Sequence, residues 1–352
     1  MRRFLAIAAL SIVAAACTTQ EAAPAGPLVL LTHDSFVLSD SVLAQFTEQT
    51  GIEVEIVTAG DAGEVVNRAV LTSGKPDADV LFGVDNTLLS RAVDAEVFEP
   101  YAAAGLADVP AQIGDLGAGV VTAIDYGDVC VNIDDEWFAT SGVPVPRTLN
   151  DLTKPAYRDL FVMPNPATSS PGLAFLLASV ARYGDPDSPE PTVQWQQFWR
   201  QLADNGVLVV NGWTEAYTGE FTAGGGGGDR PIVLSYATSP PAEIVFAAEP
   251  KPTEPSTSVM DDGCFRQVEF AGVLRGSERV DAARQLVDFL LTPTVQEDVP
   301  LNMFVFPAVS GTALPAEFEF ALRPSDPLTV TPEQIVAGRE SWVQEWTDIV
   351  LR

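Results

Sequence analysis

Strands and helices are predicted to alternate at the start of the globular part of the chain, and this alternation limits the fold more than any other feature. Short apolar strands are expected at 28–31, 52–57 and 80–82. Apolar residues recur at helical spacing between these strands, and a further helix is expected over 87–93. This order is typical of a mostly parallel sheet whose strands are joined by crossover helices.

Polar motifs follow the ends of these three strands. They read T-H-D-S-F at 32–36, G-D-A-G at 60–63 and G-V-D-N at 83–86. The carboxyl ends of parallel strands meet at one edge of a sheet, and ligands bind beyond that edge. We therefore expect side chains from these turns to contribute to a binding site.

The middle of the chain predicts two strands that could join separate lobes. Residues 118–133 form a long apolar segment with a polar break at 125–128, and 266–274 form a strand that could return to the first lobe. Between them, N-P-A-T-S-S-P-G-L at 165–173 opens an apolar helix. Its Ser and Thr residues are typical of helix capping, and the same backbone N–H groups could hold an anion. The motif alone leaves both interpretations open.

Two large aromatic residues stand in loops next to apolar strands. Trp213 lies in G-W-T-E-A-Y at 212–217, and Tyr236 lies in L-S-Y-A-T-S-P at 234–240. The faces of indole and phenol rings stack on flat ligands and attract cations. Core packing with a satisfied polar edge is the alternative, and we give it about equal weight on these motifs alone.

The N-terminus predicts export. Arg2 and Arg3 precede an apolar run at 4–13 and a stretch of small residues that ends at Cys17. This is typical of a signal peptide, expected over 1–16, and the run is too short for an ordinary transmembrane span. The Cys after small residues resembles a bacterial lipobox, with Ala14 where Leu is usual. We expect Cys17 to be lipidated, 17–27 to be a flexible tether, and the protein to be anchored on the outer side of the cytoplasmic membrane.

Two further cysteines remain. In an exported chain, Cys130 and Cys264 favour one disulfide over two separate buried thiols.

Charge and composition exclude several functions. The formal net charge is −29 with a pI near 4.1, which argues against nucleic-acid binding because phosphate contacts need clustered Lys and Arg. The acidity suits a cationic ligand, or serves solubility alone. His33 is the single histidine, so a zinc or copper cluster is not expected, and the chain has no G-x-S-x-G nucleophile motif. A secreted enzyme is kept only as a distant alternative.

Taken together, these motifs resemble the thiamine-binding proteins among the substrate-binding proteins of bacterial ABC importers. The six motifs quoted above and D-Y-G at 125–127 lie in the family's order, and together they cover most of 28–350. The resemblance implies an α/β, two-lobed type II periplasmic-binding-protein fold with a hinge and a cleft between the lobes. It implies a first lobe at 28–124 plus 268–310 and a second at 125–267. The tail at 311–352, whose last helix is predicted to begin at Thr331-Pro332 with a capping-box Gln334, is not assigned to a lobe.

The resemblance also implies ligand-binding residues. They are His33, Asp34, Ser35, Asp61, Thr168, Ser169, Ser170, Trp213, Tyr217, Tyr236 and Phe304. Asp61 would face the aminopyrimidine or the thiazolium, the residues at 168–170 would receive the hydroxyethyl group or its phosphate, and Trp213 with Tyr236 would line the ring slot. Relatives have Tyr near Ala242 and often at His33, so this chain presents fewer aromatic side chains than they do.

The implied partners are thiamine or a thiamine phosphate, an ABC transporter permease, and the membrane through the lipid anchor. The protein would act as a monomer without cofactor, metal or catalytic step. A polyamine or ferric ion is the alternative ligand. Iron-binding relatives use neighbouring tyrosines, and this chain has no Tyr-Tyr pair.

Overall fold

The structure is a computed structural model that describes residues 26–184, 194–225 and 227–352. The signal peptide and Cys17 expected from the sequence lie outside the described residues. The described strands are β1 Leu28–Thr32, β2 Val54–Thr58, β3 Val80–Asp85, β4 Phe98–Glu99, β5 Thr122–Asp134, β6 Phe161–Pro164, β7 Leu208–Val210, β8 Ile232–Tyr236, β9 Thr257–Leu274 and β10 Phe306–Pro307. The described α-helices are α1 Asp40–Thr50, α2 Ala62–Leu71, α3 Leu89–Asp94, α4 Ala111–Gly114, α5 Asp135–Ser141, α6 Ser170–Gly184, α7 Trp195–Asp204, α8 Pro240–Phe246, α9 Val280–Leu290, α10 Pro293–Gln296, α11 Val299–Met303 and α12 Pro332–Val350.

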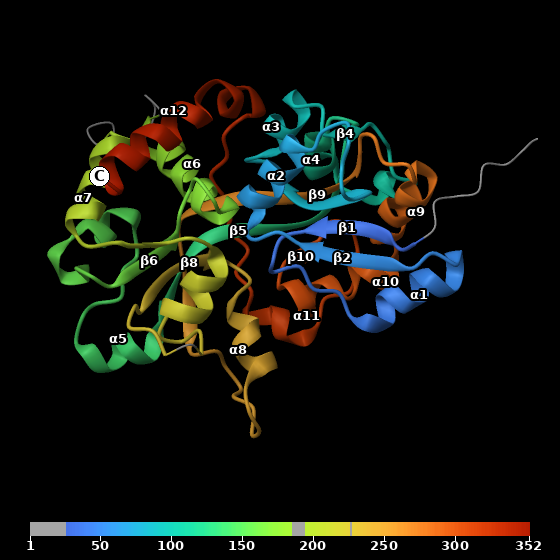
Figure 1. The fold of residues 1–352 in the computed structure, drawn as a ribbon. Helices are drawn as coiled ribbons and strands as arrows, with labels where there is room; N and C mark the ends of the chain where they lie inside the picture. The colour runs from blue at the N-terminus through green and yellow to red at the C-terminus, as the bar shows by residue number, and fades with distance from the viewer. Residues whose placement is uncertain (1–25, 185–193, 226) are drawn as a thin grey trace, which may run out of the picture.

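One sheet runs through the molecule in the order β2-β1-β3-β9-β5-β8-β6-β7 (Figure 1). The strands β2, β1 and β3 are parallel, and so are β8, β6 and β7. We refer to these two groups, with their helices, as the first and second lobes. The long antiparallel pair β5 and β9 lies between the groups and hydrogen-bonds to both. The alternation predicted at 28–93 is confirmed as β1-α1-β2-α2-β3-α3.

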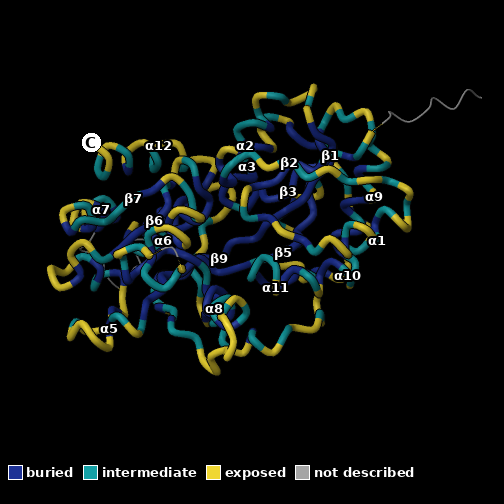
Figure 2. Tube along the Cα trace, turned by 60° about the horizontal axis from the view of Figure 1, so that its bottom comes forward, coloured by how far each residue is buried: buried dark blue, intermediate teal, exposed yellow. Residues whose placement is uncertain are grey.

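The two crossing strands are buried along most of their length. β5 has 13 residues and β9 has 18, and the tube in Figure 2 is buried through both where they pass the middle of the sheet. Their pairing continues from Thr122 with Ala271 to Asp134 with Thr257. The polar break at 125–128 does not end β5, because cross-strand hydrogen bonds to β9 continue through it. Both joining strands expected from the sequence are therefore confirmed.

The first residues of β2 and α6 differ from the sequence prediction by two or three positions, and local backbone geometry is consistent with both differences. Gly51 ends α1 in the left-handed conformation, and the Ile52 N–H donates to the Thr50 hydroxyl, so β2 begins at Val54 rather than at 52. The helix expected from 173 begins at Ser170. Pro171 is compatible with its first turn, because the proline ring favours a helical φ and the missing N–H is not needed there.

The C-terminal helix α12 packs against both lobes. It begins at the predicted capping box of Thr331 and Gln334. The fully buried Trp346 packs edge-to-face on Trp199 of α7, with 5.7 Å between ring centroids. The helix also lies beside α6 and α3 (Figure 1). The tail that the sequence left unassigned thus bridges the outer side of the two lobes.

The predicted disulfide is confirmed between Cys130 of β5 and Cys264 of β9. Both cysteines are buried and pack against Ala237. The bond therefore links the two crossing strands covalently at the second-lobe side. Within the described residues, no helix is both long and apolar enough to cross a membrane.

Candidate ligand-binding cleft

A cavity of about 350 Å³ lies between the lobes. Its size is within the range of small-molecule sites. It brings together nine of the side chains predicted from the sequence, which are His33, Asp34, Ser35, Asp61, Ser170, Trp213, Tyr217, Tyr236 and Phe304. The first lobe supplies residues from the turns after β1 and β2, and the second lobe supplies residues around the ends of β7 and β8, as expected for an α/β site.

Thr168 and Ser169 line a different cavity, together with Arg91 of α3 and Arg339 of α12. The Thr168 hydroxyl donates to the Asn211 carbonyl at 2.6 Å. The structure thus separates the T-S-S motif: Ser170 lines the main cleft and Thr168 lines the second cavity, while Ser169 lines the second cavity and also lies close enough to Asp61 to lower its pKa.

The aromatic residues form a corner in the second lobe. Trp213 stacks on Tyr217 with 5.2 Å between centroids and 12° between planes. Tyr236 is tilted by 60° to the indole at 6.3 Å. The indole N–H donates to Ser235 at 2.9 Å, which fixes the ring. Tyr217 covers one face of Trp213, so a ligand ring would meet the corner between the indole and the Tyr236 phenol.

Phe304 closes the cavity from the first-lobe side. It ends α11 in a left-handed conformation at φ 52°, and its ring lies 5.5 Å from Phe246 of α8. Phe246, Met303 and Ala242 also line the cavity, so part of the apolar wall comes from residues that the sequence did not single out.

His33 is held on two sides. The Ser35 backbone N–H donates to Nδ1 at 3.2 Å, which places the ring proton on Nε2, 3.2 Å from Glu269 Oε1. Burial lowers the pKa of His33, but the Glu269 carboxylate and the nearby Asp61 and Asp34 outweigh it, so the pKa lies above its usual value. Gly83 makes room for this ring: at its φ of 96°, a Cβ would lie 2.3 Å from His33 Cδ2.

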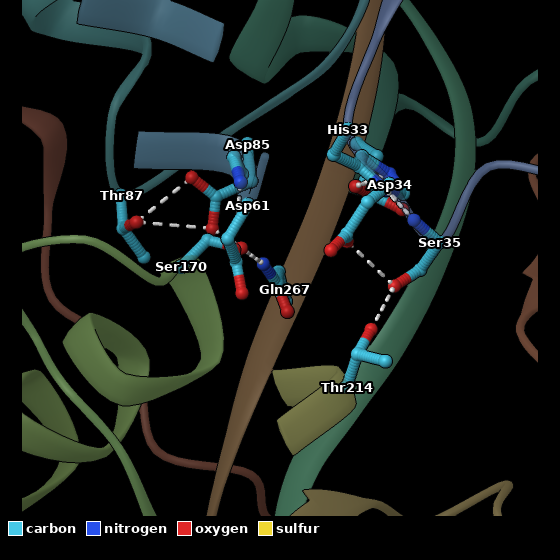
Figure 3. Close-up of polar contacts among 11 residues, drawn as sticks. His33, Asp34, Ser35, Asp61, Asp85, Thr87, Ser170, Thr214 and Gln267 are labelled. Atoms are coloured by element: carbon cyan, nitrogen blue, oxygen red, sulfur yellow. Dashed lines mark hydrogen bonds and ion pairs between the residues drawn. The ribbon is translucent and has the colours of Figure 1, made fainter. Parts of the chain in front are cut away.

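Asp61 connects the two lobes. Its Oδ1 accepts from the Ala62 N–H at 2.6 Å and caps α2, and its Oδ2 accepts from the Trp213 N–H at 3.0 Å. The Ser35 and Thr214 hydroxyls meet across the same cleft at 3.4 Å (Figure 3). Burial raises the pKa of Asp61, while the Trp213 N–H, the Ser169 side chain, His33 and the Ala62 N–H lower it in part. Asp61 therefore contacts the second lobe as well as facing the cavity.

A buried hydrogen-bond network lies behind the cleft and also joins the lobes. Asp85 accepts from the Thr87 hydroxyl at 2.8 Å and from the Gln267 side-chain amide at 2.7 Å. The same amide nitrogen donates to Ser170 of α6 at 2.8 Å (Figure 3). Gln267 belongs to β9, so this crossing strand directly links Asp85 of the first lobe to helix α6 of the second lobe.

Replacing Asp85 with Asn is expected to flatten the dependence of stability on pH. Burial is the main reason that the pKa of Asp85 rises from 3.8 to about 7. The folded state then holds a proton more tightly than the unfolded chain, so this group's contribution to stability falls as pH rises from 3.8 through about 7. As pH rises, the parent should lose more unfolding free energy than the Asp85→Asn protein. The difference between the two losses is expected to be a few kcal/mol at most, because one pKa unit corresponds to about 1.4 kcal/mol.

Urea denaturation of the parent and Asp85→Asn proteins at pH 5 and pH 8 measures this difference. The stability lost by the parent between the two pH values should exceed that lost by the variant. If the parent and the variant lose the same stability between pH 5 and pH 8, Asp85 is ionised in the folded protein at both pH values.

Glu269 and Asp125 are functional candidates that the sequence prediction missed. Glu269 of β9 lines the cavity beside His33, and Asp125 of β5 is directly opposite it in the sheet. A lone Glu in the apolar run V-E-F-A of a predicted buried strand was a usable signal, because such a position rarely holds an unpaired charge. Asp125 lies in the polar break, which marks a possible crossing point and contains the family motif D-Y-G at 125–127, but which was not predicted to bind the ligand.

The cleft thus combines a π-rich wall with an acidic floor. Lys and Arg are absent from its lining among the described residues. Those residues also contain no group of three or more His, Cys, Asp or Glu side chains arranged to hold a metal ion. This chemistry suits a flat organic cation.

Comparison with known proteins gives the family. Residues 75–336 match the family model described as bacterial extracellular solute-binding protein. The chain belongs to this family. Its members bind solutes outside the cytoplasm, so the expectations of a binding protein rather than an enzyme, and of export, are confirmed at that level.

Individual relatives cover nearly the whole chain. The thiamine-binding periplasmic protein of Salmonella typhimurium is 31% identical over 330 residues, which are 92% of this chain and 94% of the relative. Its counterpart in Escherichia coli is 30% identical over the same shares. The Brucella melitensis protein with the same description is 28% identical over 98% of each chain.

Solved structures confirm the α/β, two-lobed type II periplasmic-binding-protein fold. A periplasmic thiamin binding protein matches with a TM-score of 0.76 and 28% identity over 92% of this chain and 96% of that one. Iron-bound HitA from Pseudomonas aeruginosa matches with a TM-score of 0.71 at 20% identity over 92% of this chain and 99% of that one. The second likeness supports the fold alone.

Proposed function

We propose that this protein is the extracytoplasmic receptor for thiamine, or for a thiamine phosphate, and delivers it to an ABC transporter permease. The observation that carries the proposal is the cleft itself, in which the corner of Trp213 and Tyr236 faces the acidic floor formed by Asp61 and Glu269. Thiamine-binding relatives that cover more than nine tenths of the chain support the same ligand.

Thiamine fits this cleft chemically. It has two flat rings joined by a bend, and one ring is permanently cationic. Two aromatic planes tilted by 60° can each face one ring of such a ligand. Contacts between a desolvated cation and an aromatic face contribute about 0.5–2 kcal/mol each, and the nearby carboxylates add attraction.

Direct binding measurement tests the proposal. Calorimetry with the purified, unliganded protein should show saturable 1:1 binding of thiamine, accompanied by quenching of tryptophan fluorescence. Spermidine tests the polyamine alternative and ferric citrate tests the iron alternative; neither is expected to reproduce the quench. Tight binding of either one without binding of thiamine would overturn the assignment.

We further propose that the lobes close around the ligand by bending at β5 and β9. The boundaries we infer are those implied by the family resemblance, 28–124 plus 268–310 and 125–267. Hinge closure of this kind is a common response of two-lobed binding proteins. Two features support it: contacts between the lobes line the cleft, and two continuous strands cross between them.

Replacing Cys17 with Ser is expected to release the protein from the membrane. We propose that Cys17 carries the lipid, since it follows the small residues of the export signal. One acyl chain binds a membrane only marginally, so stable anchoring requires more than one. Fractionation should find the parent with membranes and the Cys17→Ser protein in the soluble extracytoplasmic fraction. A variant that stays wholly with the membrane would exclude this anchor.

A further inference from the structure

Two buried carboxyl groups lie side by side where the crossing strands pass beneath the cleft. Asp125 of β5 pairs with Glu269 of β9 in the antiparallel register. Directly opposite residues in such a pair point to the same face, with their Cβ atoms roughly 5 Å apart. Asp125 is fully buried and Glu269 is 8% exposed. Two carboxylates this close in a buried place do not both ionise readily.

The missing hydrogen bonds of Asp125 favour this residue as the member that holds the proton. Among the described residues, neither side-chain oxygen of Asp125 has a hydrogen-bond donor. A buried carboxylate without a donor is costly, whereas a carboxylic acid can itself donate to a neighbouring carboxylate. Burial and the negative charge of Glu269 both raise the pKa of Asp125 well above its usual value. One proton on Asp125, on the side that faces Glu269, would remove both the cost of the missing donor and the repulsion within the pair.

Within the described part of the chain, Glu269 has one neighbouring side chain that can carry a positive charge, His33, and otherwise faces acids and a phenol. His33 approaches from the turn after β1, at 3.2 Å from Nε2. Asp85 at the end of β3 and the Tyr236 phenol of β8 are the other titratable groups coupled to it. Burial and these acids raise the pKa of Tyr236, so it remains a neutral phenol. With no Lys or Arg in the described cavity lining, His33 is the one side chain there that can meet Glu269 as a cation, and a bound cation would add a second positive charge.

We propose that Glu269 is the counter-ion of the ligand's cationic ring, and that binding of the cation expels the proton shared by Asp125 and Glu269. This inference rests on the proposed function. The step is a simple dissociation: the O–H bond of Asp125 breaks, its electron pair stays on the carboxylate, and the proton leaves to solvent. The cation then compensates the second negative charge that would otherwise be unfavourable.

The release gives ligand affinity a definite pH dependence. The complex holds fewer protons than the free protein, so affinity rises with pH wherever the free pair is protonated and the complex is not. One released proton corresponds to an increase of about tenfold in affinity per pH unit. Affinity should level off at high pH, where the free pair has already lost its proton.

Calorimetry in paired buffers measures the proton directly. Thiamine is titrated into the protein at one pH in two buffers with different ionisation enthalpies, and the difference in observed heat gives the number of protons released. We expect a value between about 0.5 and 1 near neutral pH. Asp125→Asn keeps the shape and hydrogen-bond donor of the protonated acid, so it should bind thiamine while releasing only the protons that the ligand itself exchanges.

Two further variants test the counter-ion role of Glu269 separately from the source of the released proton. Glu269→Gln should weaken thiamine binding by about ten- to a hundredfold, as expected for loss of a charged partner. His33→Gln should keep the proton release. The folding of each variant is checked by its thermal transition.

Three outcomes would overturn the inference. They are no proton release by the parent protein, full release by Asp125→Asn, and loss of release in His33→Gln, which would assign the proton to the imidazole. Unchanged affinity in Glu269→Gln would remove the counter-ion role. Failure of the parent to bind thiamine at all is a different result, which contradicts the proposed function rather than the origin of the proton.

Discussion

A Trp213→Ala protein is expected to bind thiamine roughly thirtyfold or more weakly than the parent. The indole is one side of the aromatic corner, and Tyr217 and the Ser235 hydroxyl hold it in position. Removing a central aromatic anchor of a binding site typically costs about 2 kcal/mol or more, and 1.4 kcal/mol corresponds to a factor of ten. Calorimetry gives the affinity, and the ligand-induced fluorescence quench should largely disappear.

Trp342→Ala is the matched control. Trp342 lies in α12, packs against the core and does not line the cleft. Its removal should lower the unfolding temperature and leave both thiamine affinity and the quench unchanged. If Trp213→Ala binds thiamine as tightly as the parent, the aromatic corner is a packing feature and the thiamine proposal loses its main physical support.

Local sequence patterns predicted the elements of the fold well. Apolar runs and helical spacing identified β1, β3, α1 and α2, because burial on one face requires those periods. The capping box at Thr331 identified the start of α12 for the same kind of local reason. The placement of α12 was not predictable, because its contacts with α3 and α7 depend on residues far away in the sequence.

The binding cleft was predictable only where motifs mark it. The turns after β1 and β2 and the aromatic loops yielded residues that now line one cavity. Glu269 and Asp125 were missed because each sits inside a strand, and only the register of β5 against β9 brings them together. The T-S-S motif was assigned as a unit, yet the start of α6 directs Ser170 toward the cleft, leaves Thr168 at the second cavity and keeps Ser169 beside Asp61.

Gly63→Ala is expected to weaken thiamine binding by about five- to a hundredfold without loss of stability. Gly63 lies in the first turn of α2, and its N–H donates to the Thr168 carbonyl of the second lobe at 3.1 Å. A Cβ on Gly63 would lie 2.4 Å from that carbonyl oxygen. Two backbones collide there, so the lobes would have to separate, and the neighbouring bond from Trp213 to Asp61 would lengthen.

The magnitude follows from the cost of crowding at a packed contact, which is typically about 1–3 kcal/mol. The cost applies to the closed arrangement, so it reduces affinity by shifting the population toward open forms. The helix itself should tolerate the change, because alanine is roughly 1 kcal/mol better than glycine in a helix interior. Affinity is measured by calorimetry, and closure by small-angle scattering with and without thiamine.

Gly184→Ala, at the end of α6, provides the control for a helical glycine away from the cleft. Its added Cβ would make only ordinary contacts, the nearest at 3.7 Å to Val180. This variant should close and bind as the parent does. Equal affinity in Gly63→Ala and the parent would mean that the contact between Gly63 and Thr168 is absent from the ligand-bound state, and the hinge proposal would then need a different closed geometry.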